Sequence, residues 1–324
     1  MQHWYLAAPL AWLVILATRR LAEPDFLAAG SSERSNHTGR PQQIGGFALI
    51  CCVAVPAILG AITAPAVLPV AAGWLLLFAL GLFDDLYDWS AGIKFAVQLL
   101  AATLIVLALV PAAPATMLLL AACAIVALAY WINAVNFMDG LDWMLAAGLG
   151  IPLAAASLLL LASAPSALSP FAYAGLWSAA GLAGFALWNA PPAKVFMGDS
   201  GALLLGGVSG TLILLLCLHG SPAAAIIPFL HFLFDTLRTI AIRLKAGENI
   251  FRAHSRHAYQ TAFRSGLAAR AIALRVALLS LALSAIAALA VWLDSVFADA
   301  ALLALALLMT AWFDANLRNR KNAV

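Results

Sequence analysis

Carboxylate, amide and basic side chains gather in four short segments that separate long apolar stretches. The first segment holds Asp84, Asp85 and Asp88, and Lys94 follows shortly after them. In a helix, Asp84 and Asp88 would share a face. Adjacent carboxylates repel one another unless a cation, a proton or a basic group intervenes, and their oxygens suit Mg²⁺ that carries phosphates. The segment therefore favours metal and phosphate chemistry over an acidic solvated loop.

The second segment follows an apolar stretch and carries Asn136, Asp139 and Asp142 at intervals of three residues. A helical turn would align these side chains. Asn offers both a donor and an acceptor, as a uracil or a sugar amide requires, and Asp can bind a metal or hydroxyl groups. A capped turn into the next helix explains the same residues equally well, because Asn and Asp favour cap positions.

The third segment runs from Asn189 through Lys194 to Asp199, which lies between Gly198 and the Ser200–Gly201 pair. Asp199 could simply cap the following helix. The small neighbours also allow close approach of the backbone, and a helix N-terminus is a natural site for phosphate or metal-bound phosphate. The two roles are compatible.

The fourth segment carries His254 and His257 among Arg252, Arg256 and Arg264. A His-x-x-His pair could indicate zinc, but no third His or Cys lies nearby and the arginines oppose a cation. Arginine and imidazole can both donate hydrogen bonds to a diphosphate. We therefore predict phosphate binding, with both rings on one face if the segment forms a helical turn. A basic loop that only enforces topology would explain the arginines but not the histidines.

The apolar stretches around these segments exclude an ordinary soluble domain. The chain is 65% hydrophobic and only 10% charged, with a mean hydropathy of +1.00. Stretches of about 17 to 25 apolar residues match helices that cross a bilayer core of roughly 30 Å. We predict an all-α integral membrane protein in which residues 1–324 form one domain with about eleven transmembrane helices, at 4–18, 44–62, 67–83, 93–110, 115–133, 143–163, 171–189, 200–218, 223–242, 268–292 and 299–316.

The basic residues predict the orientation of these helices. Arg19 and Arg20 follow the first apolar stretch instead of preceding it, which argues against a cleaved signal and for a periplasmic N-terminus. With eleven spans, all 17 Lys and Arg residues would lie at or near the cytoplasmic side. The C-terminus and all four segments would then also be cytoplasmic. This basic face suits anionic lipids and phosphates, and we expect no nucleic acid partner.

In their order and common sidedness, the four segments resemble the polyprenyl-phosphate N-acetylhexosamine-1-phosphate transferase superfamily. The resemblance covers nearly the whole chain and extends to residues 33–38, to the Gly45–Gly46 pair and to residues 234–237. The Ala-His-x-x-His-x-Tyr-Gln form of the fourth segment is more similar to the enzymes that initiate O-antigen or capsule chains than to the peptidoglycan translocase.

Two positions depart from the pattern of that superfamily. Trp143 stands where a Gly commonly follows the second Asp, and Ile44 stands where an Arg often precedes the glycines. The first departure bears on the nucleotide pocket. The second bears on one phosphate contact that the resemblance would otherwise imply.

The resemblance implies a reaction at the cytoplasmic face of a bacterial inner membrane. In it, UDP-N-acetylhexosamine and undecaprenyl phosphate give undecaprenyl-diphospho-N-acetylhexosamine and UMP, with Mg²⁺ or Mn²⁺ as cofactor. It also leaves room for a homodimer. The implied roles are metal binding by Asp199, phosphate activation or metal support by Asp84 and Asp85, phosphate binding by Lys94, His254, Arg256 and His257, and binding of the nucleotide side by Asn136, Asp139, Asp142 and Asn189.

Two other functions compete with this interpretation. An intramembrane prenyltransferase also uses two Asp-rich cytoplasmic motifs with Mg²⁺, but it does not explain the Gly-Asp-Ser-Gly and histidine segments. A proton-coupled transporter would place ionisable groups near the bilayer midplane, often in broken helices. Here nearly all such groups are predicted at one face, which disfavours transport.

Overall fold

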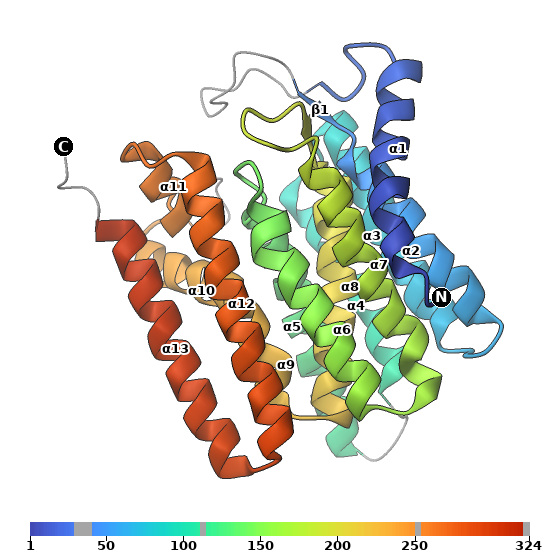
Figure 1. Cartoon of the computed structure of the whole chain (residues 1–324), viewed down its shortest axis with the longest axis vertical. Helices are drawn as coiled ribbons and strands as arrows, with labels where there is room; N and C mark the ends of the chain where they lie inside the picture. Colours follow the sequence, from blue (N-terminus) through green and yellow to red (C-terminus); the bar gives the residue numbers. More distant parts are fainter. Residues whose placement is uncertain (29–40, 111–114, 250–253, 320–324) are drawn as a thin grey trace.

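The computed structural model describes residues 1–28, 41–110, 115–249 and 254–319, and helices dominate these residues (Figure 1). Residues 33–38 and Arg252 lie outside the described part. The main helices are α1 (Ala7–Leu21), α2 (Gly45–Ala61), α3 (Val67–Tyr87), α4 (Ala91–Leu109), α5 (Ala115–Phe137), α6 (Ile151–Ser163), α7 (Ser169–Ala186), α8 (Gly198–His219), α9 (Pro222–Ile226), α10 (Leu230–Lys245), α11 (Ala258–Arg264), α12 (Ala269–Leu293) and α13 (Val296–Arg318).

Short elements link some of these helices. They are the 3-10 helices η1 (Trp4–Leu6), η3 (Ser166–Leu168) and η4 (Ile227–Phe229), the π-helix η2 (Ala146–Gly150), and the strands β1 (Gln42–Gln43) and β2 (Val195–Phe196). Among the described residues, 8 helical segments are long and apolar enough to cross a membrane, and α2 is a shorter apolar helix. The protein is therefore an all-α, multi-pass membrane protein, as predicted. The count of eleven spans and the orientation of the termini stay predictions.

Helix α8 lies at the centre of the bundle, where it packs against α2, α3, α5, α6 and α7. Small residues allow this close packing. At Gly206, for example, a Cβ would lie 2.8 Å from Ile132 Cα of α5. Apolar side chains gain little by leaving lipid for protein, so close contact at small residues is a major source of association between membrane helices.

The strands β1 and β2 tie the start of α2 to the start of α8. They pair in parallel, with Gln42 beside Val195. Just beyond them, Gly46 N donates to Met197 O at 3.0 Å, and a Cβ on Gly46 would lie 2.6 Å from Gly201 N. Ile44 is fully buried here. An aliphatic core side chain therefore occupies the position where the resemblance would place an Arg.

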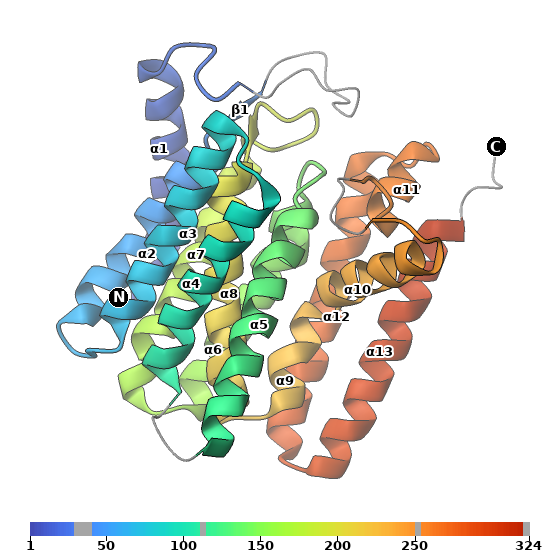
Figure 2. The ribbon, with the colours of Figure 1, turned by 180° about the vertical axis from the view of Figure 1, so that it is seen from behind.

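The predicted span at 223–242 is helical but not continuous. It divides into α9, η4 and α10, with Pro228 inside η4. Proline lacks an N–H and clashes with the preceding turn, so it breaks a helix at this point. Figure 2 shows α10 turning away from α9 and running across the bundle toward α11 and α13. This bend brings α10 against α13.

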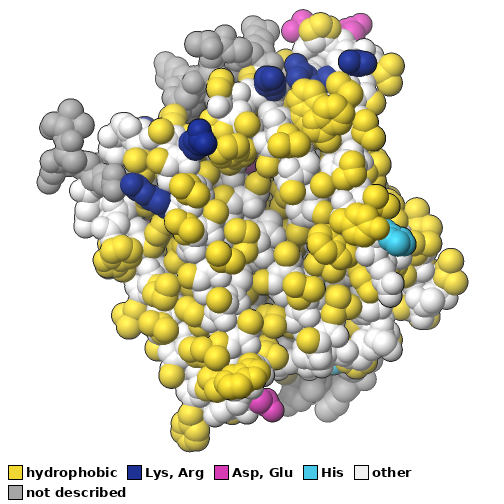
Figure 3. Space-filling model, in the orientation of Figure 1, with side chains coloured by type: hydrophobic (Ala, Val, Ile, Leu, Met, Phe, Trp, Pro, Cys, Tyr) yellow, Lys and Arg dark blue, Asp and Glu magenta, His cyan; other side chains and the backbone are white. Residues whose placement is uncertain are grey.

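Basic side chains gather toward one end of the molecule. On the face shown in Figure 3, the visible Lys and Arg side chains lie in the upper part, where α1 ends and α11 is found. This arrangement agrees with the one-sided distribution expected from the sequence.

Candidate active site

Asp84 lies near the end of α3 and is held from two sides. Trp89 N donates to its Oδ1 at 2.8 Å, and Lys94 Nζ donates to its Oδ2 at 2.8 Å. Helix α3 ends at Tyr87, and Asp88 then adopts a left-handed conformation with φ 49°. The turn that follows brings Lys94 at the start of α4 back onto Asp84. The first predicted segment therefore supplies its own compensating cation.

Asp85 points instead at the start of α8. Its Oδ1 accepts a hydrogen bond from Asp199 N at 2.9 Å, and its Oδ2 accepts one from Ser200 N at 3.1 Å. A carboxylate is favourable at a helix N-terminus, because the first N–H groups there lack partners within the helix. Gly198 leaves room for this contact, since a Cβ there would lie 2.7 Å from Asp85 Oδ2. Asp84 and Asp85, for which the resemblance implies phosphate activation or metal support, therefore have different contacts.

Three helices meet at Asp199. The Asp84 carboxyl group and the Asn136 amide lie beside the Asp199 side chain and act on its charge. Asp84 comes from the end of α3, Asn136 from the end of α5, and Asp199 from the first turn of α8. Two carboxyl groups in contact require a shared proton or a cation. These three residues, with Lys94, form what we call the acidic centre.

Asp139 adds negative charge beside the acidic centre. Burial raises its pKa well above the usual range, and the nearby carboxylates of Asp199, Asp85 and Asp142 raise the pKa further. A carboxyl group in such surroundings takes up a proton readily unless a cation arrives.

The second segment does not form the helical turn that would align its three polar residues. Helix α5 ends at Phe137, and Tyr259 of α11 packs directly against Gly140, where a Cβ would collide with the phenol oxygen. As a result, Asn136 is the one member of this segment that belongs to the acidic centre. Asp142 is buried in another direction, and its Oδ2 accepts a hydrogen bond from Ala193 N at 3.0 Å.

Asn189 also makes loop contacts. Its Oδ1 accepts a hydrogen bond from Trp143 N at 2.6 Å, and its Nδ2 donates to Val195 O at 2.9 Å. Together with Asp142, it joins the loop after α5 to the loop before α8. In the described contacts, both predicted substrate-binding residues thus serve to brace the two loops.

The structure shows how a tryptophan is accommodated at position 143, where the pattern of the superfamily commonly has a glycine. Trp143 has φ 65°, a left-handed conformation that glycine adopts without strain and tryptophan does not. Its backbone N–H donates to Asn189, and its indole Nε1 donates to Ala186 O at 2.7 Å. These two hydrogen bonds hold the residue in a conformation that would suit glycine.

The histidine segment docks on the end of α5. The rings of His254 and His257 lie 5.0 Å apart between centroids, although α11 begins only at Ala258 and no helical turn joins them. The Phe137 ring lies 6.2 Å from His257, and Tyr259 Oη donates to Phe137 O at 3.0 Å. The predicted pairing of the rings therefore occurs without the predicted helical turn, one residue from Asn136.

The two histidines and Arg256 have different surroundings. His257 is buried and His254 is half-buried. Burial lowers the pKa of His254 to about 4, and the basic groups of His257, Arg243 and Arg256 contribute to that shift. Near neutral pH the His254 imidazole is therefore uncharged. Arg256 is exposed and forms an ion pair with Glu248.

The donor atoms of the acidic centre suit a hard cation. Among the described residues, no group of three His, Cys, Asp or Glu side chains is arranged to hold a metal by itself. Mg²⁺ commonly binds through one or two carboxylates, with phosphates and water as the other ligands. The contact between Asp84 and Asp199 fits that pattern.

A cavity of about 360 Å³ lies elsewhere, between η2, α6, α7 and α12. Trp143, Ile151 and Leu274 are among its lining residues, and Arg270 is its charged member. No residue of the acidic centre lines this cavity. We therefore locate the candidate site at the acidic centre.

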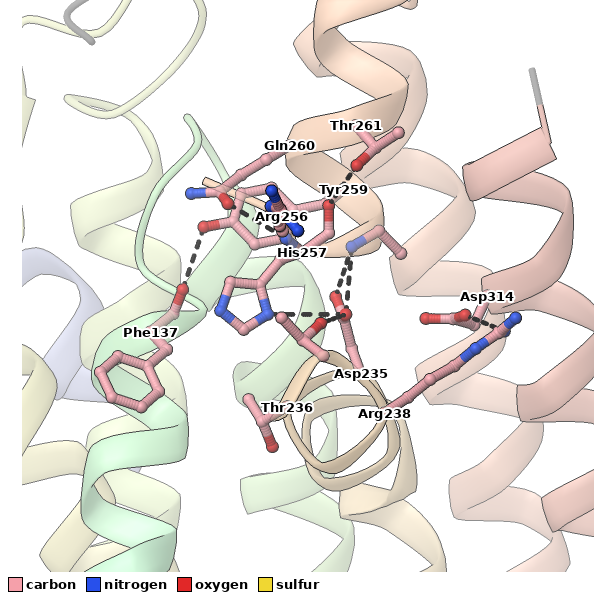
Figure 4. A network of polar contacts seen from close by, with 12 residues as sticks. Phe137, Asp235, Thr236, Arg238, Arg256, His257, Tyr259, Gln260, Thr261 and Asp314 are labelled. Atoms are coloured by element: carbon pink, nitrogen blue, oxygen red, sulfur yellow. Dashed lines mark hydrogen bonds and ion pairs between the residues drawn. The ribbon is translucent and has the colours of Figure 1, made fainter. Parts of the chain in front are cut away.

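The sequence interpretation missed a second polar network, formed by Asp235, Thr239, Asp314 and Arg318. Figure 4 shows the part of this network around Asp235 and the neighbouring pair of Arg238 with Asp314. Asp235 lies within residues 234–237 of the resemblance and at a predicted cytoplasmic helix end, and Arg318 is one of the 17 basic residues that predict the topology, but neither fact predicts this network. The spacing of four residues between Asp235 and Thr239, and between Asp314 and Arg318, is a signal that could have shown these pairs on helix faces.

The chain is a multi-pass membrane protein with an acidic centre, and comparisons identify the proteins that it resembles. Residues 67–217 match the model of glycosyl transferase family 4. A probable undecaprenyl-phosphate N-acetylglucosaminyl 1-phosphate transferase of Bacillus subtilis (strain 168) is 29% identical over 272 residues, which cover 75% of this chain and 71% of that protein.

Two phospho-N-acetylmuramoyl-pentapeptide-transferases match over shorter regions. The protein from Mycolicibacterium smegmatis is 40% identical over 139 residues, 39% of this chain and 36% of its own length. The protein from Bacillus cytotoxicus is 42% identical over 84 residues, 26% of this chain and 25% of its own length. The family match and the names of these relatives support a place for the chain in the polyprenyl-phosphate hexosamine-1-phosphate transferase superfamily, and with it a phosphoglycosyltransferase activity. The family match includes the acidic centre and ends before the histidine segment.

Proposed function

We propose that the protein transfers a sugar 1-phosphate from a UDP-N-acetylhexosamine to undecaprenyl phosphate. The products are undecaprenyl-diphospho-N-acetylhexosamine and UMP, and the reaction initiates O-antigen or another cell-envelope glycan. The observation that carries the proposal is the contact of Asp199 with both Asp84 and Asn136. This contact unites three polar segments into one centre at the basic end of a membrane bundle.

In the proposed reaction, an oxygen of the lipid phosphate attacks the β-phosphorus of the nucleotide sugar. A new phosphorus–oxygen bond forms, and the bond to the oxygen bridging the two phosphates breaks, so UMP leaves with that oxygen. A phosphate monoester is already mostly ionised near pH 7, so the nucleophile needs no strong general base. The main task of the protein is to bring two anions together and hold them in line.

Asp84 and Asp199 are the proposed ligands of Mg²⁺ or Mn²⁺, which would neutralise charge on the diphosphate. Asp85 acts one step removed, because its two hydrogen bonds to the start of α8 hold Asp199 toward Asp84. Lys94 supplies a positive charge for the phosphates and is kept in place by its ion pair with Asp84.

The remaining groups border this centre. Neutral His254 can donate a ring N–H to the diphosphate, with His257 and Arg256 beside it. Asn136 and Asp139 are proposed to face the nucleotide side. Asp142 and Asn189 are proposed to shape that side by bracing the two loops. We also propose that this end of the molecule faces the cytoplasm of a bacterial cell, with the protein in the inner membrane.

The direct test combines purified protein, undecaprenyl phosphate and Mg²⁺ with a panel of UDP-sugars. A panel is needed because small differences in a pocket can select among N-acetylglucosamine and its deoxy relatives. We expect a lipid diphosphate sugar, identified by mass spectrometry, and an equal amount of UMP. Absence of a lipid product with every UDP-N-acetylhexosamine, from protein that is folded by thermal melting, would refute the proposal.

A further inference from the structure

The polar network shown in Figure 4 lies where α10, α11 and α13 meet. At its centre is Asp235, whose side chain is fully buried. Both of its carboxylate oxygens accept from Ala258 N at 3.0 Å, and its Oδ1 accepts from Thr239 Oγ1 at 3.1 Å. Asp235 on α10 thus caps the first turn of α11.

Arg318, at the end of α13, joins the network from the other side. Its Nη2 donates to Asp235 Oδ1 at 2.5 Å and to Thr239 Oγ1 at 2.9 Å. Its Nη1 donates to Arg256 O at 2.8 Å, and its Nε donates to Asp314 Oδ2 at 2.9 Å. One guanidinium therefore connects α10, the histidine segment and α13.

The charges of this network balance. Two carboxylates, Asp235 and Asp314, lie with two guanidinium groups, Arg318 and Arg238, and Arg238 pairs with Asp314 alone. A buried carboxylate is stable only when it is paired and hydrogen-bonded. Removing Arg318 would leave Asp235 without its guanidinium, whereas removing Arg238 would leave the bonds of Asp235 intact.

The network reaches the acidic centre through the histidine segment. His257 immediately precedes α11, and its Nδ1 lies 3.5 Å from Asp235 Oδ1. Tyr259, in the first turn of α11, donates a hydrogen bond to Phe137 O, and Phe137 is the residue after Asn136 in the chain. The position of α11 therefore determines where His257 lies relative to the end of α5.

We propose that Arg318 and Asp235 are positioning residues that hold the histidine segment against the acidic centre. The C-terminal helix α13 is then part of the catalytic apparatus, because it carries the guanidinium that locks α11 to α10. The kinetic part of this inference rests on the proposed transferase function. The structural part, the fixing of α11 by Arg318, does not.

The kinetic test uses Arg318→Ala with Arg238→Ala as its matched control. The control removes an ion pair between the same two helices without touching Asp235. We expect Arg318→Ala to raise KM for the UDP-sugar and to lower kcat/KM roughly ten- to a hundred-fold, the effect of losing a charge-assisted contact at the diphosphate. KM for undecaprenyl phosphate should change little. Arg318→Lys should restore part of the activity, since it keeps the charge but not the planar set of donors.

A double-mutant cycle shows whether Arg318 acts through the histidine. If it does, adding His257→Ala to Arg318→Ala should cost little beyond the larger single loss, because the two changes disrupt one unit. Fully additive losses would overturn the proposal. If Arg318→Ala does not fold, Arg318→Lys can replace it in the double-mutant cycle.

Hydrogen exchange tests the structural part without any substrate. Backbone amides of Ala258–Arg264 should exchange faster in Arg318→Ala than in Arg238→Ala or the unchanged protein. Equal exchange in all three would refute the inference even if the enzyme is active. If exchange rises but no UDP-sugar is turned over, the proposed function fails and the positioning of α11 stands.

Discussion

Asp84 and Asp85 are neighbours in the chain, but their carboxylates contact different groups. Asp84 faces Lys94 and Asp199, whereas Asp85 accepts the first backbone N–H groups of α8. Successive residues on a helix point about 100° apart, so adjacent carboxylates at a helix end naturally meet different neighbours. A pair of carboxylates thus combines one group that can bind a ligand with one that fixes the helix carrying Asp199.

At the scale of single residues, Asp199→Asn is expected to abolish turnover. The change keeps the size of the side chain but removes a proposed metal ligand. Because metal-ion catalysis contributes several kcal/mol, kcat should fall roughly a hundred-fold or more. Asp88→Asn is the matched control, because Asp88 is exposed and Asn tolerates its left-handed backbone. Rates measured over a Mg²⁺ titration would decide. Near-normal activity and Mg²⁺ dependence in Asp199→Asn would contradict the metal assignment.

The lowered pKa of His254 predicts a pH dependence of stability. The folded protein holds this pKa at about 4, whereas an unfolded chain has a histidine pKa of about 6.5. Between these values, falling pH protonates the unfolded state first and therefore lowers stability. Between about pH 7.5 and pH 5, the Tm of His254→Gln should fall less than the Tm of the unchanged protein. The difference between the two should be modest, because the side chain is half-buried. Identical losses in the two proteins would show that His254 does not titrate in this way.

At the scale of elements, the close approach of α2 to α8 depends on Gly46. A methyl group at this position would collide with Ser200 and with Gly201 N, and overpacking of this kind costs about 1–3 kcal/mol. We expect Gly46→Ala to lower both Tm and activity, since α8 carries Asp199. Gly92→Ala is the control, because a Cβ there meets nothing within 4 Å. If both variants melt alike, the contact between the two helices is not limiting.

The helices could be predicted from the sequence, because burial in lipid requires long apolar stretches whatever their partners are. The polar segments that supply Asp84, Asn136 and Asp199 could be predicted as well. Ionisable groups near the membrane interior are costly, so their presence at the ends of apolar stretches indicates a function. The residues that these polar groups contact could not be predicted from the sequence. The contact of Asp142 with Ala193 N joins residues far apart in the chain, and only packing brings them together. The same holds for Asp235 and Arg318.

Local sequence signals were overridden by packing at one element and were incomplete at another. The regular spacing of Asn136, Asp139 and Asp142 indicated a helical turn, but α11 occupies the space beside Gly140 and the chain turns there instead. At η4, Pro228 is a visible helix breaker, but the sequence does not indicate the ion pairs that α10, the helix after the break, makes with α13.

At the scale of the whole molecule, the start of α8, the start of α11 and the end of α13, which carry Asp199, the histidine segment and Arg318, lie toward the same end of the bundle as the visible basic side chains (Figures 1 and 3). In the proposed reaction and orientation, this positively charged end would attract both the anionic substrates and the anionic cytoplasmic leaflet. The lipid phosphate and the nucleotide sugar can therefore meet at the membrane surface, without either charged group entering the hydrocarbon core.

Helix α12 offers the sharpest test of this orientation, because its two ends are both exposed. It runs from Ala269 to Leu293, about 37 Å at 1.5 Å per residue, enough to cross a bilayer core of roughly 30 Å. Ala268→Cys precedes it, near the histidine segment, and Val296→Cys follows it at a residue that is 83% exposed. A membrane-impermeant maleimide should label Ala268→Cys only from the cytoplasmic side and Val296→Cys only from the periplasmic side, with the unaltered protein as the background for its native cysteines. Labelling of Ala268→Cys from the periplasm would invert the topology and place the acidic centre where no nucleotide sugar is supplied.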